Sequence, residues 1–103
     1  MVDQQKFQMM IQQLQMVSQQ IATLRNQESE LEATIEIVTS QDDDMGLYRQ
    51  AGSILAEVGD RKSLLDELKS TKDKISMALS QLSIRENELR EDYEKLATEF
   101  EGK

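Results

Sequence analysis

Hydrophobic residues recur at alternating spacings of three and four along two long stretches of the chain, residues 3–39 and 61–100. This spacing places them in one stripe along a helix, a pattern typical of helices that pack against another helix. Nine of ten stripe positions in the first stretch and nine of eleven in the second are apolar. The stripes consist of Phe7, Met10, Leu14, Val17, Ile21, Leu24, Glu28, Leu31, Ile35 and Val38, and of Leu65, Leu68, Lys72, Ile75, Leu79, Leu82, Glu86, Leu89, Tyr93, Leu96 and Phe100.

The two predicted helices match in length, and only some twenty residues join them. Each would be roughly 55 to 60 Å long at about 1.5 Å per residue. Because a short connection favours antiparallel neighbours, the sequence predicts a mainly α fold, a long antiparallel two-helix coiled coil, as a single domain over residues 1–103. The alternative, two helices that run apart to meet other chains, leaves both apolar stripes uncovered.

The connection between the helices has a different composition, with three of the four glycines. The acidic run Asp42–Asp44 is expected to end the first helix, and Asp60 is a candidate N-cap for the second. Between them, Leu47–Ala51 and Ile54–Val58 predict two short strands around a tight turn, a β-hairpin within residues 45–58. A disordered acidic loop is the alternative. Since the edges of an isolated hairpin attract other strands, this hairpin is predicted to pair with strands of other subunits.

Polar residues interrupt the apolar stripes at three positions, Glu28, Lys72 and Glu86. Facing residue numbers in an antiparallel pair keep a nearly constant sum, which is 100 if Ile35 faces Leu65. Glu28 then faces Lys72, and this ion pair would fix the register of the helices. Glu86 then faces Leu14 and has no obvious partner, so it either loosens the helix pair locally or reaches solvent along its own stem.

Apolar residues at the two chain ends exceed what a two-helix stripe needs. An antiparallel pairing brings both ends together, and unbranched Met side chains adapt to irregular apolar surfaces. These residues are therefore candidates for binding unfolded proteins, with Met16 beside them; alternatively, they only complete the coiled coil. The candidates are Phe7, Met9, Met10, Ile11, Tyr93, Leu96 and Phe100.

Composition narrows the chemistry that the chain can perform. Its 103 residues contain no Cys and no His, which removes thiol nucleophiles, the commonest general base and the commonest zinc ligands. We therefore expect no enzyme activity, no metal and no cofactor. A net charge of -8 disfavours nucleic acid and anionic membranes as partners, and the absence of long apolar runs predicts a soluble, cytoplasmic protein.

The central segment Leu47–Leu55 between two matched heptad helices resembles the beta class of prefoldin subunits. Its features are a short apolar strand with an aromatic residue, a Gly turn and a second apolar strand. The single hairpin fits the beta class, because the alpha class has two. By this resemblance, the residues that would build the shared barrel are Leu47, Tyr48, Ala51, Gly52, Ile54, Leu55 and Val58.

The resemblance implies a hexamer of two alpha-class and four beta-class subunits, with the coiled coils projecting from a platform of β-barrels. Such complexes hold unfolded client proteins at the coiled-coil tips without ATP and deliver them to a group II chaperonin. The chain would then be a holdase subunit. A structural coiled-coil adaptor or spacer, which joins fixed partners and binds no clients, is the alternative function.

Overall fold

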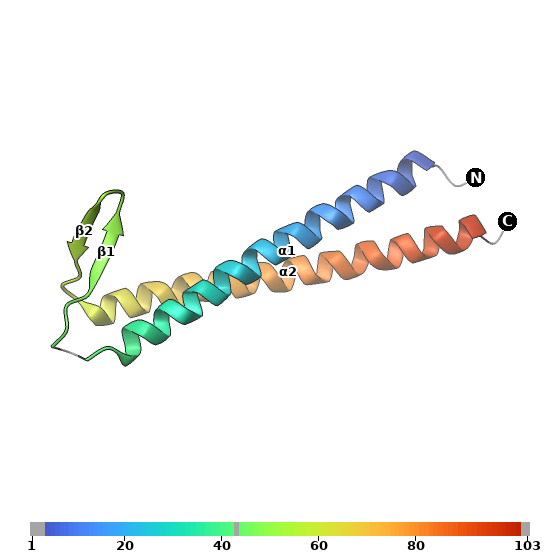
Figure 1. The fold of residues 1–103 in the computed structure, drawn as a ribbon. Coiled ribbons are helices and arrows are strands. Elements are labelled where there is room, and N and C mark those ends of the chain that lie inside the picture. Colours follow the sequence, from blue (N-terminus) through green and yellow to red (C-terminus); the bar gives the residue numbers. More distant parts are fainter. Residues whose placement is uncertain (1–3, 43, 102–103) are drawn as a thin grey trace. The chain divides into compact units, whose positions relative to one another are not determined.

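The computed structural model describes residues 4–42 and 44–101, with side chains described as far as residue 99. Helix α1 spans Gln4–Ser40, strand β1 Tyr48–Ala51, strand β2 Ile54–Glu57 and helix α2 Arg61–Glu101 (Figure 1). The predicted fold of two long helices around one hairpin is confirmed. Helix α1 ends at Ser40, before the acidic run, of which Asp43 lies outside the described residues.

The chain comprises two compact units, and each helix contributes to both. Unit 1 contains residues 4–26 of α1 and 77–101 of α2, and unit 2 contains residues 27–76 with the hairpin. The sequence-based prediction of a single domain over residues 1–103 stays a prediction.

The core of unit 1 consists of stripe residues from both helices. Val17 and Ile21 of α1 pack with Leu89 of α2, and the half-buried Leu14, Leu79 and Leu82 surround them. Closer to the chain ends, the rings of Phe7 and Tyr93 lie 4.8 Å apart between centroids, at an angle of 38°. Since low numbers in α1 face high numbers in α2, the helices of this unit are antiparallel, as the stripes predict.

In unit 2, Val38 near the end of α1 is buried. The connection is fixed at both helix ends. The Arg61 guanidinium donates hydrogen bonds to the carbonyls of Gln41 and Asp42, placing a positive charge beside the end of α1. At the start of α2, the carboxylate of Asp60 accepts a 3.1 Å hydrogen bond from the N–H of Ser63. This geometry confirms Asp60 as the N-cap.

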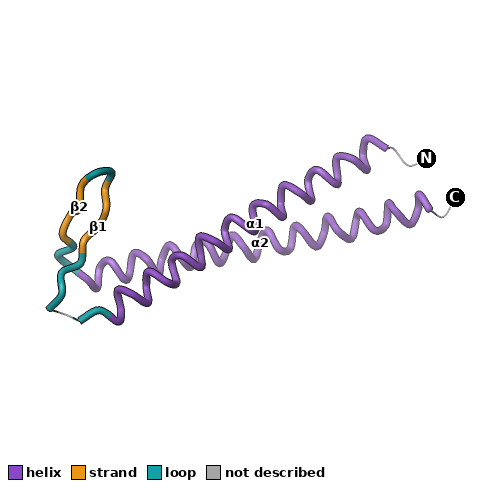
Figure 2. Tube along the Cα trace, viewed as in Figure 1, coloured by secondary structure: helices purple, strands orange, loops and turns teal. Residues whose placement is uncertain are grey.

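The strands β1 and β2 form an antiparallel hairpin within unit 2 (Figure 2). Tyr48 pairs with Glu57, and Ala51 with Ile54. In the connecting turn, Gly52 has a φ of +63°, a conformation that residues other than Gly rarely adopt. Gly at the first central position of such a turn is typical of type II′.

The predicted ion pair between Glu28 and Lys72 was wrong. The Lys72 ammonium lies 3.2 Å from Glu32, and Glu28 instead accepts a 2.7 Å hydrogen bond from the Ser76 hydroxyl. Both contacts join residues whose numbers sum to 104 rather than 100, a displacement of about one helical turn. Glu32 is more than half exposed, so Lys72 reaches a carboxylate in unit 2 that has kept much of its hydration.

Glu86 has two partners in the structure, whereas the predicted register offered no obvious one. The Ser18 hydroxyl donates a 2.9 Å hydrogen bond to its carboxylate, and Arg90 lies 3.5 Å away on the next turn of α2. The side chain is 21% exposed. Its polar atoms are therefore satisfied inside unit 1 by a hydroxyl and a guanidinium, which pattern analysis of apolar positions does not reveal.

Candidate functional site

The hairpin of unit 2 exposes every one of its strand residues. Tyr48, Ile54 and Leu55 are 63%, 66% and 69% exposed, so three large apolar side chains of one short hairpin face solvent. The pairing places Tyr48 and Leu55 on one face of the hairpin and Ile54 on the other. Both faces therefore present apolar surface, and the outer edges of both strands carry backbone groups without a strand partner among the described residues.

Contacts within unit 2 hold the hairpin in place. The Arg49 guanidinium of β1 makes two 3.4 Å hydrogen bonds to the two carboxylate oxygens of Glu67 on α2. The N–H of Val58 donates a 2.8 Å hydrogen bond to the carbonyl of Leu47, which closes the base of the hairpin. Gly46 lies against the ring of Tyr48, where a Cβ would come within 3.2 Å of the ring. The predicted barrel residues are thus brought together on one short, anchored hairpin.

The predicted binding residues at the chain ends divide into two groups in unit 1. Leu96 is buried and Phe7, Met10, Ile11 and Tyr93 are half-buried, so these belong to the helix pair or its border. Met9 is 59% exposed and points away from the stripe. Phe100 belongs to α2, and its side chain lies outside the described residues.

Two exposed apolar residues of unit 1 were missed by the sequence analysis. Met77 and Ile84 of α2 are 66% and 59% exposed. They are seven residues apart and off the stripe, as Met9 and Met16 are on α1. An apolar residue that repeats every seven positions outside the stripe is the signal that would have found them, because such residues share one outer face of a helix.

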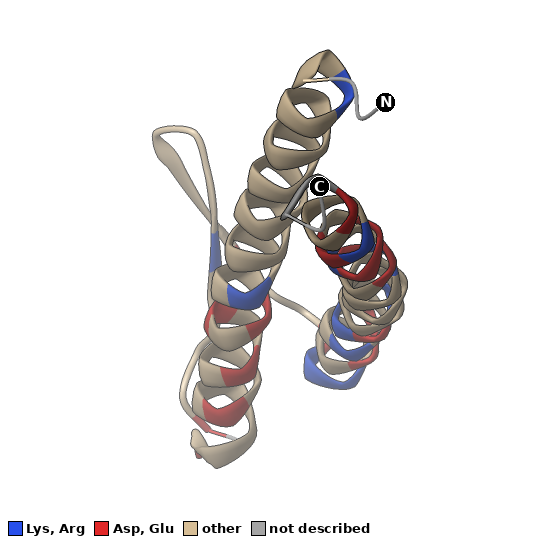
Figure 3. Cartoon of the chain, turned by 90° about the vertical axis from the view of Figure 1, so that its right-hand side faces the viewer, with Lys and Arg blue, Asp and Glu red and all other residues tan. Residues whose placement is uncertain are grey.

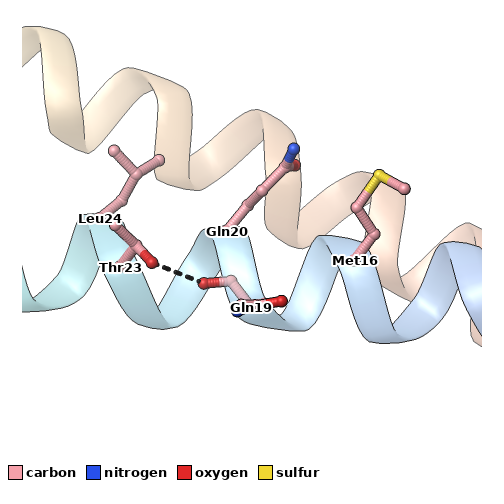
Figure 4. Close-up of a pocket in the computed structure, with 5 residues that line it drawn as sticks. All are labelled: Met16, Gln19, Gln20, Thr23 and Leu24. Atoms are coloured by element: carbon pink, nitrogen blue, oxygen red, sulfur yellow. Dashed lines mark hydrogen bonds between the residues drawn. The ribbon is translucent and has the colours of Figure 1, made fainter.

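A shallow hollow of ≈ 440 Å³ lies on the surface of α1 in unit 1. Met16, Gln20 and Leu24 project from one side of the helix at spacings of four, with Gln19 and Thr23 beside them (Figure 4). The Thr23 hydroxyl donates a 3.0 Å hydrogen bond to the carbonyl of Gln19. The lining residues therefore offer apolar atoms and side-chain amides, and none of them carries a charge.

Metal and membrane features are absent over residues 4–42 and 44–101. No three His, Cys, Asp or Glu side chains in these ranges converge as a metal site requires. Neither helix, over the same ranges, has the length of apolar sequence needed to cross a bilayer.

A known protein family accounts for nearly the whole of this chain. A family model described as prefoldin subunit matches residues 2–103. The chain therefore belongs to the prefoldin subunit family. The resemblance to the beta class of this family is also confirmed, by curated relatives.

The curated relatives are prefoldin beta subunits from two Thermoplasma species. Prefoldin subunit beta of Thermoplasma acidophilum is 36% identical over 67 residues, which are 65% of this chain and 54% of the relative. Prefoldin subunit beta of Thermoplasma volcanium is 34% identical over 67 residues, with the same coverage. The match to this chain thus spans about half the length of these prefoldin subunits.

Solved prefoldin structures share the fold. The crystal structure of the prefoldin beta subunit from Thermococcus strain KS-1 has a TM-score of 0.84 and 23% identity, covering 94% of this chain and 84% of that one. The prefoldin beta2 subunit from the same strain has a TM-score of 0.74 and 21% identity, covering 87% of this chain and 95% of that one. At these identities the likeness concerns the fold alone.

Proposed function

We propose that this chain is a subunit of an ATP-independent molecular chaperone, which holds unfolded proteins and delivers them to a group II chaperonin. Membership of the prefoldin subunit family supports the chaperone role. The proposed compartment is the cytoplasm, where newly made chains emerge unfolded. No enzymatic step and no cofactor enter the proposal.

The exposed hairpin is the observation that carries this proposal. A two-stranded hairpin is marginal alone in water, and this one leaves Tyr48, Ile54 and Leu55 uncovered on its two faces. Strands from other subunits would satisfy the free edges and cover the apolar faces in a barrel. We propose alpha-class subunits and further beta-class subunits as these partners, together forming a hetero-hexamer.

The chain ends in unit 1 are the proposed client-binding surface. Met9 offers an exposed, flexible apolar side chain, and the half-buried Met10 and Ile11 lie beside it. Phe7, Tyr93 and Leu96 are engaged between the helices and would bind clients when the helix ends separate. Phe100 completes the proposed set from its position in the sequence.

Aggregation of a dilute denatured protein tests the proposal. The chain is added without ATP, alone and together with an alpha-class prefoldin subunit, while light scattering follows both aggregation and the mass of the complex. We expect assembly to about six chains and suppressed aggregation. A stable monomer or dimer that neither joins the partner nor delays aggregation would contradict the proposal and favour an adaptor or spacer.

A further inference from the structure

The outer surface of α1 in unit 1 carries no charged side chain over 18 consecutive residues, Phe7–Leu24. Along this part of α1 the ribbon in Figure 3 lacks both charge colours between its first and second basic residues. The stretch presents exposed Met9 and Met16 and the hollow beside Met16. An apolar segment can cover this face without removing a charge from water, a step that is costly wherever a charge stays unpaired.

The facing part of α2 is acidic. Glu91, Asp92, Glu94 and Glu99 are exposed, and none of them has an ion pair among the described residues. Lys95 is the basic residue among them, so residues 91–99 carry four negative charges and one positive charge, a net of -3. The two arginines nearer the core, Arg85 and Arg90, lie beside Glu88 and Glu86. The acidic charge is therefore available to a bound molecule.

The acidic stretch is close enough to act on anything bound to α1. The two helices of unit 1 are in direct contact through Phe7 and Tyr93 and through Ser18 and Glu86. Packed helix axes lie about 8–10 Å apart, and the screening length at physiological salt is about 8 Å. The flanks of a segment on α1 thus experience a negative potential, which attracts basic residues and repels acidic ones.

Charge also decides between the possible occupants of the α1 face. A second copy of this chain would bring a net charge of -8 and its own acidic α2, so the two copies would repel each other at this face. An apolar segment flanked by Lys or Arg complements both the uncharged face of α1 and the acidic stretch of α2.

We propose that unit 1 selects apolar client segments with basic flanks over equally apolar segments with acidic flanks. The selection would combine the Met9 and Met16 face of α1 with the carboxylates of residues 91–99 on α2. This inference rests on the proposed chaperone function and adds to it the class of client sequence that binds best.

Three labelled peptides test the inference on the full chain assembled with an alpha-class prefoldin subunit. They share one apolar core and carry Lys, Ser or Asp at the flanks, and fluorescence anisotropy measures their affinity. At about 0.01 M salt we expect the Lys peptide to bind about tenfold more tightly than the Asp peptide, with the Ser peptide between them. The difference should fall to less than about twofold at about 1 M salt, where the screening length is about 3 Å.

A charge-neutral variant locates the effect in unit 1. Glu91→Gln, Asp92→Asn, Glu94→Gln and Glu99→Gln together should abolish the preference. The matched control changes the same number of exposed carboxylates in unit 2, with Glu30→Gln, Glu36→Gln, Asp66→Asn and Asp73→Asn, and should retain it. If either variant loses helix content, the salt dependence of the Lys and Asp peptide affinities for the unmodified chain tests the charge preference instead.

The outcomes separate this inference from the proposed function. Equal affinities for the Lys and Asp peptides, together with suppressed aggregation, would overturn the charge selection and leave the chaperone role intact. Equal loss of preference in both variants would assign the effect to the total charge of the chain and overturn the assignment to unit 1. If no peptide binds and aggregation proceeds unhindered, the chaperone function fails as well.

Discussion

Ser76 donates a 2.7 Å hydrogen bond to the carboxylate of Glu28, across the two helices of unit 2. Glu28 occupies a stripe position where an apolar residue would pack, and both residues are half-buried. A half-buried carboxylate needs a donor, because desolvation without one is unfavourable. The hydroxyl of Ser76 supplies this donor, so the polar position is tolerated and also favours one register of the helices.

A double-mutant cycle at these two residues tests this account. Ser76→Ala should lower the free energy of unfolding by about 1 kcal/mol, because Glu28 loses a donor. In a Glu28→Leu background the same change should have almost no effect, since no carboxylate remains to be satisfied. Urea unfolding followed by circular dichroism, at one fixed chain concentration, measures both. An equal loss in the two backgrounds would show that the hydrogen bond contributes nothing.

The partner of Lys72 gives a second prediction. Lys72→Glu places a like charge beside Glu32 and should destabilise the chain by at most about 1 kcal/mol, the range of partly exposed ion pairs. Adding Glu32→Lys should restore the loss, whereas adding Glu28→Lys should not, because Glu28 faces Ser76. Thermal unfolding at low salt compares the two double variants. If Glu28→Lys restored more stability than Glu32→Lys, the result would contradict this register and favour one in which the numbers of facing residues sum to 100.

The helices and the hairpin could be predicted because each leaves a local signal in the sequence. A seven-residue stripe marks a helix pair, Asp60 precedes a helix start, and Gly52 suits a turn that requires positive φ. The register could not be predicted in the same way. A shift by one turn keeps most apolar layers apolar, so the choice rests on partners such as Ser18 and Ser76, which the stripe does not include.

The candidate site shows the same division between local signals and tertiary packing. Exposure of Met9 follows from its position off the stripe. The contact of Phe7 with Tyr93 joins residues whose numbers sum to 100, as in the predicted register, whereas the contacts of Ser18 and Ser76 sum to 104, so the stripe alone does not determine which turns of the two helices meet. Met77 and Ile84 lie in the middle of α2 and off the stripe, so neither the stripe nor the surplus of apolar residues at the chain ends marks them.

The hairpin faces give a third prediction. Tyr48→Ser with Leu55→Ser removes the apolar side chains from one exposed face and should leave the helix content of the isolated chain unchanged, because neither residue is buried in it. Assembly with an alpha-class subunit should be lost or weakened at least about tenfold, since a central aromatic residue of an interface often contributes 2 kcal/mol or more. Light scattering and sedimentation measure the assembled mass.

Gln50 provides the matched control for this hairpin variant. This polar residue of β1 lies on the same face of the hairpin as Tyr48 and Leu55. It pairs with Leu55 of β2 in the register of the two strands. Gln50→Ser should therefore leave assembly nearly unchanged. If the double variant assembles as well as the Gln50→Ser control, the apolar face of the hairpin takes no part in subunit contact.

The contact between Phe7 and Tyr93 joins the two helices of unit 1 near the chain ends. A cross-link at this contact tests whether the helix ends must separate to bind clients. The chain has no Cys, so Phe7→Cys with Tyr93→Cys introduces a single pair of thiols, at positions whose native rings lie 4.8 Å apart. Joining the two thiols with a short cross-linker holds the helix ends together. We expect the joined form to suppress aggregation less than the same variant left unjoined, because the inner faces of the helices become inaccessible while Met9 and Met16 stay exposed. Equal suppression by both forms would show that the outer surface alone binds clients. In that case, adding Met9→Gln and Met16→Gln to the joined form should abolish its suppression of aggregation.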